Sequence, residues 1–216
     1  MTAATTRRNQ LRDGVWWRPD RVSWWMGLLF AIGSACFALA AIASQWASAP
    51  RPAIGVTFFV GSILFTVAAC LQWGPAAWQP RRIDWLASTI QLAGTLFFNV
   101  STFEGMKRGL DTHETNLRVW APDIFGSICF LVSSELAYAE VCHRWVCLCL
   151  RSLSWRIVAV NLVGSIAFGV SAVTSLIEPS TSEPVSAAIA NAGTAIGALC
   201  FLAGGIMLLP EAAHAR

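Results

Sequence analysis

Apolar residues gather into six long segments along the chain, separated by short polar stretches. The segments are 23–46, 53–73, 85–103, 124–142, 157–177 and 185–209. Each has about 20 residues, the length at which an α-helix crosses roughly 30 Å of hydrocarbon. A soluble protein would have to bury six such helices on every face, which a chain of 216 residues cannot do. The pattern therefore predicts an all-α, polytopic membrane protein with six transmembrane helices.

One five-residue motif occurs in every apolar segment: a glycine, a small residue, two unrestricted positions and a phenylalanine. Its glycines are Gly33, Gly61, Gly94, Gly126, Gly164 and Gly197. Residues four apart lie on the same face of a helix, so the phenylalanine stands one turn from the glycine. Glycine lets a neighbouring backbone approach, and small-residue interfaces of this kind hold membrane helices together. We interpret the six glycines as helix-packing positions, with a pore lining as the alternative.

The odd-numbered segments also share a tryptophan nine residues before the glycine, at Trp24, Trp85 and Trp155. Tryptophan prefers the membrane interface, so these positions mark the same boundary in each copy. The repeating unit is then a two-helix hairpin, and such parallel repeats are related by an axis along the membrane normal. The predicted organisation is a single membrane domain with approximate threefold pseudosymmetry. It comprises a tail at 1–16 and three tandem helical hairpins at 17–77, 78–145 and 146–216.

Positive charges are divided unequally between the two sides of this arrangement. The tail, the second and fourth loops and the C-terminus carry 11 arginines, whereas the other side has Arg51, Lys107, Arg108 and Arg118. The excess of Lys and Arg marks the cytoplasmic side. We therefore expect a multi-pass protein of the plasma membrane with both termini cytoplasmic, and an exposed charged loop at 104–119. The net charge of +3 reflects this bias and indicates no nucleic-acid partner.

The stretch from Trp25 to Trp73 carries Gly33-Ser34 and Gly61-Ser62, each followed by the motif phenylalanine. It resembles the YrhK-like membrane domain, a pair of helices that each carry a Gly-Ser-x-x-Phe element. Two further short stretches, Phe98–Thr102 and Trp120–Asp123, are similar to those of uncharacterised actinobacterial integral membrane proteins. The resemblance implies a bacterial membrane fold and no established activity.

Polar residues depart from the repeat chiefly in the second hairpin. Ionisable groups at membrane depth are costly and indicate a functional site. Asn99 and Asp123 are expected at similar depths on antiparallel neighbours, so we predict a hydrogen-bonded pair between them. Asn161 lies at the same offset from its glycine as Gln91. The candidate polar membrane site consists of Gln91, Asn99, Ser101, Asp123, Glu135 and Asn161.

Each of these residues also has a structural interpretation. Asp123 follows Pro122 and suits the first turn of a helix, or it lines a cavity. Glu135 is placed near the cytoplasmic interface, where Arg144 or Arg82 could pair with it. Gln91 and Asn161 either join neighbouring helices through hydrogen bonds or contact a ligand.

The seven cysteines predict no disulfide framework, because Cys142, Cys147 and Cys149 fall on the cytoplasmic side, where thiols stay reduced. Together with His143 they match no standard zinc spacing, so no metal site is predicted. The three histidines lie outside the apolar segments, and the single lysine, Lys107, lies in a loop. We therefore expect neither haem nor retinal. No nucleotide-binding or hydrolase motif occurs, which predicts that the protein is not an enzyme and has no cofactor.

Two functions remain open. The first is a non-enzymatic membrane module whose helices pack within the chain. Its partner would be a second copy of the chain or another membrane protein. It predicts a sealed core in which Asn99, Asp123 and Gln91 satisfy one another. The second is a small-solute or ion transporter or channel with a polar lining from the third to fifth helices. It predicts a hydrated cavity that reaches Asp123 or Glu135. In either case the helices contact the lipid bilayer.

The orientation can be tested with a reporter enzyme that is active only outside the cytoplasm. Fused after Arg216, the reporter should be inactive, whereas an insertion between Arg108 and Gly109 should be active. An active reporter after Arg216 would contradict the cytoplasmic C-terminus.

Overall fold

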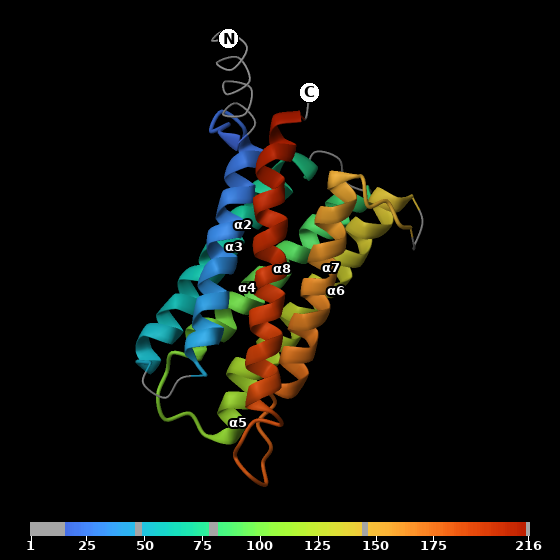
Figure 1. The fold of residues 1–216 in the computed structure, drawn as a ribbon. Helices are drawn as coiled ribbons and strands as arrows, with labels where there is room; N and C mark the ends of the chain where they lie inside the picture. The colour runs from blue at the N-terminus through green and yellow to red at the C-terminus, as the bar shows by residue number, and fades with distance from the viewer. Residues whose placement is uncertain (1–15, 46–48, 78–81, 144–146, 215–216) are drawn as a thin grey trace.

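The computed structural model describes residues 16–45, 49–77, 82–143 and 147–214. Its six long helices run side by side, and the start of α2 and the end of α8 lie at the same end of the bundle (Figure 1). We call this the terminal end and the opposite one the α5 end. The short helix α5 (Thr112–Thr115) and the π-helical turn η1 (Asn116–Trp120) lead into α6. The long helices are α2 (Val22–Ala43), α3 (Arg51–Ala76), α4 (Ile83–Glu104), α6 (Ala121–Cys142), α7 (Leu153–Thr174) and α8 (Ala187–His214).

Five helical stretches in the described residues are long and apolar enough to cross a membrane. They comprise α2, α3, α7, most of α8 and the continuous stretch Thr112–Cys142. The remaining long helix, α4, has 22 residues and so spans about 33 Å. It is more polar because it carries Asp84, Gln91 and Asn99. These helices are those of a multi-pass membrane protein.

The long helices form a closed ring. Each packs against the next one in the chain, and α8 packs against α2. Where the ring closes, the two backbones touch: a Cβ atom on Gly205 would lie 2.8 Å from the amide nitrogen of Ala31 and 3.0 Å from the carbonyl oxygen of Gly27. Small residues permit this approach between membrane helices. The ring therefore has no open edge between the first and last helices.

Within each hairpin the two motif glycines face one another. A Cβ on Gly33 would lie 3.0 Å from the carbonyl oxygen of Gly61, and a Cβ on Gly61 would lie 3.0 Å from that of Gly33. The same reciprocal approach brings Gly164 and Gly197 together, at 3.1 and 2.9 Å. In the second hairpin a Cβ on Gly126 would lie 3.2 Å from the carbonyl oxygen of Gly94. The three helix pairs thus cross at equivalent places.

The six motif phenylalanines meet at the centre of the ring and form what we call the phenylalanine prism. Three rings, from α2, α4 and α7, form a triangle toward the α5 end, with centroids 6.0–6.3 Å apart. The other three, from α3, α6 and α8, form a second triangle, with centroids 5.5–6.1 Å apart. Within each hairpin, the ring that belongs to the first triangle contacts the ring that belongs to the second, with centroids 5.1–5.7 Å apart. The prism consists of Phe37, Phe98 and Phe168 in the first triangle and Phe65, Phe130 and Phe201 in the second.

The prediction of an exposed loop at 104–119 is wrong for the second half of this range. A helix begins at Thr112, where Asp111 and Glu114 form a capping box, and it continues through η1 into α6. The Ala121 amide donates to the Asn116 carbonyl five residues back, so the helix widens just before Pro122. Proline has no amide hydrogen, and such a local adjustment lets the helix pass it. Asp123 is therefore inside a continuous helix and does not begin one.

The crossing contacts can be tested by the same substitution at two glycines of α7. Leucine at Gly164 would press on Cys200 Cβ at 2.9 Å and on Phe201 at 3.0 Å. We expect Gly164→Leu to lower the free energy of unfolding in detergent by about 3 kcal/mol, at the upper end of overpacking costs. A Cβ on Gly169 would meet nothing within 4 Å, so Gly169→Leu is the matched control. Equal melting temperatures for both variants would contradict the assigned packing.

Candidate functional site

Two polar cavities lie on opposite sides of the phenylalanine prism. The terminal-end cavity has a volume of about 270 Å³ and the α5-end cavity about 330 Å³. Between them, among five rings of the prism and Ser62, the free space is about 10 Å³. One water molecule needs about 10–15 Å³. The prism therefore separates the two cavities.

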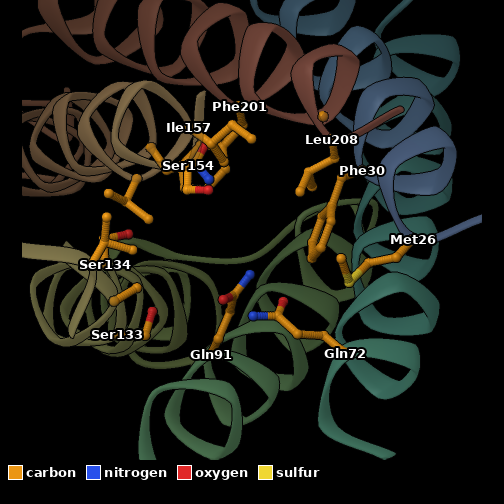
Figure 2. A pocket seen from close by; sticks show the side chains of 15 residues that line it. Met26, Phe30, Gln72, Gln91, Ser133, Ser134, Ser154, Ile157, Phe201 and Leu208 are labelled. Atoms are coloured by element: carbon orange, nitrogen blue, oxygen red, sulfur yellow. The ribbon is translucent and has the colours of Figure 1, made fainter. Parts of the chain in front are cut away.

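The terminal-end cavity is lined by neutral polar groups. Figure 2 shows Gln72 on α3 and Gln91 on α4 directed into it, with Ser133 and Ser134 on α6 opposite. Asn161 on α7 also lines it, and the buried side-chain oxygen of Asn161 has no hydrogen-bond partner within the described part of the chain. A Cβ on Gly204 would collide with that oxygen, so the glycine leaves room for the Asn161 amide against α8. Among the described lining residues none is charged.

The structure thus brings two of the predicted site residues, Gln91 and Asn161, into one cavity. Gln72 is not among the predicted site residues, although the repeat contains a signal for it. Gln72 lies eleven residues after Gly61, at the offset where the other hairpins have Ala137 and Leu208. Both of these residues line the same cavity. A polar residue at one copy of an apolar position is therefore the sign that could have identified Gln72.

The α5-end cavity contains two other predicted residues, Ser101 and Asp123. Its floor is the nearer triangle of the prism, and it extends to the exposed Gly105 at the end of α4. Asp123 is the only charged residue among the described lining residues. Of the two interpretations open for Asp123, its place in the wall favours the cavity. Polar lining residues that the sequence did not identify are Thr102, Thr115, Trp120, Ser171, Ser175, Asn191 and Thr194.

The α5-end cavity is covered in part by the connection between α7 and α8. The Asn116 side chain accepts from the Ile177 amide at 3.0 Å and donates to the Ile177 carbonyl at 2.7 Å. It therefore pairs with this backbone as a neighbouring strand would. Ile177 and Ser175, which lie on the connection, line the cavity. The η1 turn thus fixes the position of the cover.

The predicted pair between Asn99 and Asp123 is not what holds Asn99. Its amide donates instead to the Thr66 hydroxyl on α3 at 2.8 Å, and its buried side-chain oxygen has no partner among the residues that the structure describes. The prediction considered only the antiparallel partner within the hairpin. In the ring α4 has α3 as its second neighbour, and the Asn99 side chain faces that neighbour. Asn99 therefore joins two hairpins.

Glu135 is half-buried on α6 and is not among the described residues that line either cavity. Of its two predicted partners, Arg144 lies outside the described residues. Arg82 forms an ion pair with Asp84 at 3.7 Å. The adjacent carboxylate therefore competes for Arg82. Glu135 therefore lies apart from the predicted site residues that the two cavities bring together.

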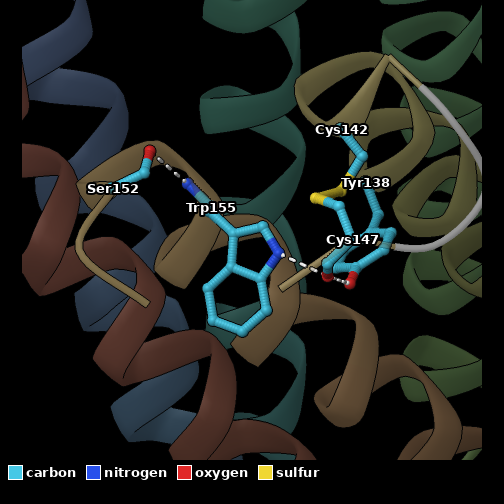
Figure 3. Close-up of a disulfide and its surroundings, with 5 residues drawn as sticks. All are labelled: Tyr138, Cys142, Cys147, Ser152 and Trp155. Atoms are coloured by element: carbon cyan, nitrogen blue, oxygen red, sulfur yellow. Dashed lines mark hydrogen bonds between the residues drawn. A yellow bond between two sulfur atoms is a disulfide. The ribbon is translucent and has the colours of Figure 1, made fainter. Parts of the chain in front are cut away.

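A disulfide joins Cys142, at the end of α6, to Cys147, with Cα atoms 5.6 Å apart. The prediction that these two thiols stay reduced is thus wrong for this structure. Figure 3 shows the Tyr138 hydroxyl and the Trp155 indole donating to the carbonyl of Cys147, and the Ser152 side chain capping α7. The bond therefore ties α6 to the start of α7. Spacing alone could not show this, because it does not determine where the chain places Cys147 relative to the end of α6.

Comparison of the chain with protein-family models, with curated proteins and with solved structures finds no match.

The disulfide's contribution can be measured by thermal unfolding in detergent. We expect Cys142→Ser to lower the free energy of unfolding by about 2 kcal/mol, the value for closing a short loop. Cys149→Ser is the control, because Cys149 is an exposed free thiol in the same segment. A reductant should destabilise the wild type and leave Cys142→Ser unchanged. A wild-type melting temperature that does not respond to reductant would refute the assigned bond.

Proposed function

We propose that this protein is a non-enzymatic membrane protein that passes a small polar solute or ion across the bilayer, and that the phenylalanine prism is its closed gate. The observation that carries the proposal is the position of two polar cavities on opposite sides of one apolar constriction. Hydrophobic constrictions gate channels by excluding water. A packing module would need no cavity at either end.

Unpaired polar groups support a solute pathway over a sealed core. The side-chain oxygens of Asn99 and Asn161 are buried without partners among the described residues. A buried polar group without a hydrogen bond costs about 1–3 kcal/mol. Asn161 lines a cavity where water or a solute could provide the bond. Such residues at membrane depth are typical of transport pathways.

The transmembrane arrangement of the proposal extends beyond the five apolar spans. We propose that α4 is the sixth span, because it lies between α3 and α6 in the ring and contributes Phe98 to the prism. The arginine bias further suggests cytoplasmic termini in a bacterial plasma membrane. Cytosolic disulfides are rare and mostly transient, so the bond at Cys142 would then be reversible. The YrhK-like resemblance of the first hairpin remains part of this proposal.

We also propose that the three hairpins are copies of one unit. In all three hairpins a motif glycine lies close to the carbonyl oxygen of its partner glycine, and the two motif phenylalanine rings contact each other. The indole of Trp24 donates to the carbonyl of Trp16 at 2.7 Å, and that of Trp155 donates to the carbonyl of Cys147 at 3.1 Å. In both cases the acceptor lies eight residues before the tryptophan. This conserved spacing within the chain supports a common origin for the first and third hairpins.

Opening the prism should create a measurable flux. We expect Phe98→Ala, in protein reconstituted into liposomes, to raise the permeability to urea, glycerol or monovalent ions at least tenfold. Removing a ring from the constriction replaces the void of about 10 Å³ with space for water. Light scattering reports the neutral solutes, and an ion-sensitive dye reports the ions.

The neighbouring Phe97 provides a matched control. It is exposed on the outer face of α4, stacks on Phe125 and is not part of the prism. Phe97→Ala should leave the permeability at the wild-type level. Because a buried Phe→Ala costs about 3–5 kcal/mol, the milder Phe98→Val is measured in parallel. Folded Phe98 variants with wild-type permeability to every solute would refute the gate and favour the packing module.

A further inference from the structure

We propose that the α5-end cavity binds a small organic cation, with Asp123 as its counter-charge. This inference specifies the ligand class for one end of the proposed pathway. It does not require the prism to open, so binding can be tested apart from transport.

The charge of the cavity is set by one residue. Asp123 is the only ionisable group among its described lining residues, and none of these residues forms a hydrogen bond or ion pair with its carboxylate. A carboxylate within a membrane-spanning stretch is costly unless a positive charge or a donor accompanies it. The basic side chains of this end, Arg51, Lys107 and Arg108, line an adjoining groove, and none of the three is among the described lining residues of the cavity. The ligand itself is therefore the natural partner of Asp123.

Most hydroxyl groups in the cavity wall donate their hydrogen to a backbone carbonyl. Thr102 donates to the Phe98 carbonyl at 2.7 Å, and Ser175 donates to the Ala172 carbonyl at 3.0 Å. Ser171 and Thr194 both reach the Ala190 carbonyl, at 2.7 and 3.1 Å. A hydroxyl that donates to the helix retains only its lone pairs for the cavity.

The Trp120 indole, a donor only, is likewise occupied by the Ala172 carbonyl at 2.9 Å. The hydrogens that remain belong to Asn191, Ser101 and Thr115. The wall therefore offers mainly acceptors, which suit a cation and disfavour an anion.

The aromatic lining distinguishes an organic cation from a metal ion. Phe37, Phe98 and Phe168 form the floor, and Phe58 and Trp120 stand in the wall. Aromatic faces attract ammonium groups, most strongly where water is excluded. A divalent metal instead needs about six oxygen ligands, including several carboxylates. One carboxylate together with five aromatic side chains in a cavity of about 330 Å³ fits a methylated or primary ammonium compound.

The whole α5 end also carries a net negative charge, which favours the approach of cations. Its cations are partly neutralised, because Lys107 pairs with Glu104 and Arg118 pairs with Glu114. Its carboxylates are Glu104, Asp111, Glu114, Asp123, Glu178 and Glu183, and its basic residues are Arg51, Lys107, Arg108 and Arg118.

Calorimetric titration of the purified full chain in lipid nanodiscs tests the site, with tetramethylammonium chloride as the probe. Sodium chloride keeps the ionic strength constant. We expect saturable binding to the wild type and at least tenfold weaker binding to Asp123→Asn, which removes the charge and keeps the shape. Asp111→Asn is the matched control at the same end, because asparagine also caps a helix start and Asp111 lies outside the cavity. It should bind within twofold of the wild type.

Two further measurements separate the charge from the rings. The neutral tert-butyl alcohol, of similar bulk, should bind at least tenfold more weakly than the probe. Phe58→Leu should weaken tetramethylammonium binding at least threefold. Three results would overturn the assignment: no binding to the wild type, equal binding to Asp123→Asn, or equal competition by sodium. None of these results changes the flux expected from Phe98→Ala, so failure of the site and failure of the gate are distinguishable.

Discussion

The contact between a phenylalanine ring and the glycine of the opposite helix is the interaction on which this structure depends. A Cβ on Gly61 would lie 2.8 Å from the Phe37 ring, and one on Gly33 would lie 2.8 Å from the Phe65 ring. The missing side chain thus lets two backbones cross closely and leaves the ring only one direction, toward the axis. Six repetitions place six rings at the centre. Because aromatic rings prefer tilted and edge contacts, they fill this space without stacking face to face.

Motif hydroxyls then join one hairpin to the next. Ser62 bonds Thr102 across α3 and α4 at 2.9 Å, and Ser165 bonds Ser134 across α7 and α6 at 2.8 Å. In a bilayer there is no hydrophobic drive between helices, so close packing and such hydrogen bonds determine which faces associate. The contact between α8 and α2 uses Gly27 and Gly205 instead, and a ring results.

The two ends of the ring differ in chemistry, although their frameworks are similar. The terminal end carries five of the eight described arginines, a cavity with neutral amides and hydroxyls in its wall, and the disulfide. The α5 end carries more carboxylates than basic residues, a cavity with one aspartate, and a cover fixed by Asn116. A symmetric framework with different side chains at its two ends suits a directional path for a solute. The two ends differ because the hairpins carry different residues outside the glycine-to-phenylalanine motifs. One set of equivalent positions, for example, holds Phe30, Gln91 and Asn161.

The sequence by itself determined the local features of this protein. Segment length and apolarity predicted the helices, and the glycine-to-phenylalanine spacing indicated where they cross, since both follow from the geometry of a single helix. Only the tertiary structure decided what each side chain meets across the ring. It directed Asn99 to Thr66, joined Cys142 to Cys147, brought Gln72 beside Gln91 and Asn161, and continued the helix through Pro122. These outcomes depend on which helices become neighbours and on how each helix is rotated about its axis. The spacing of residues along one segment determines neither of these.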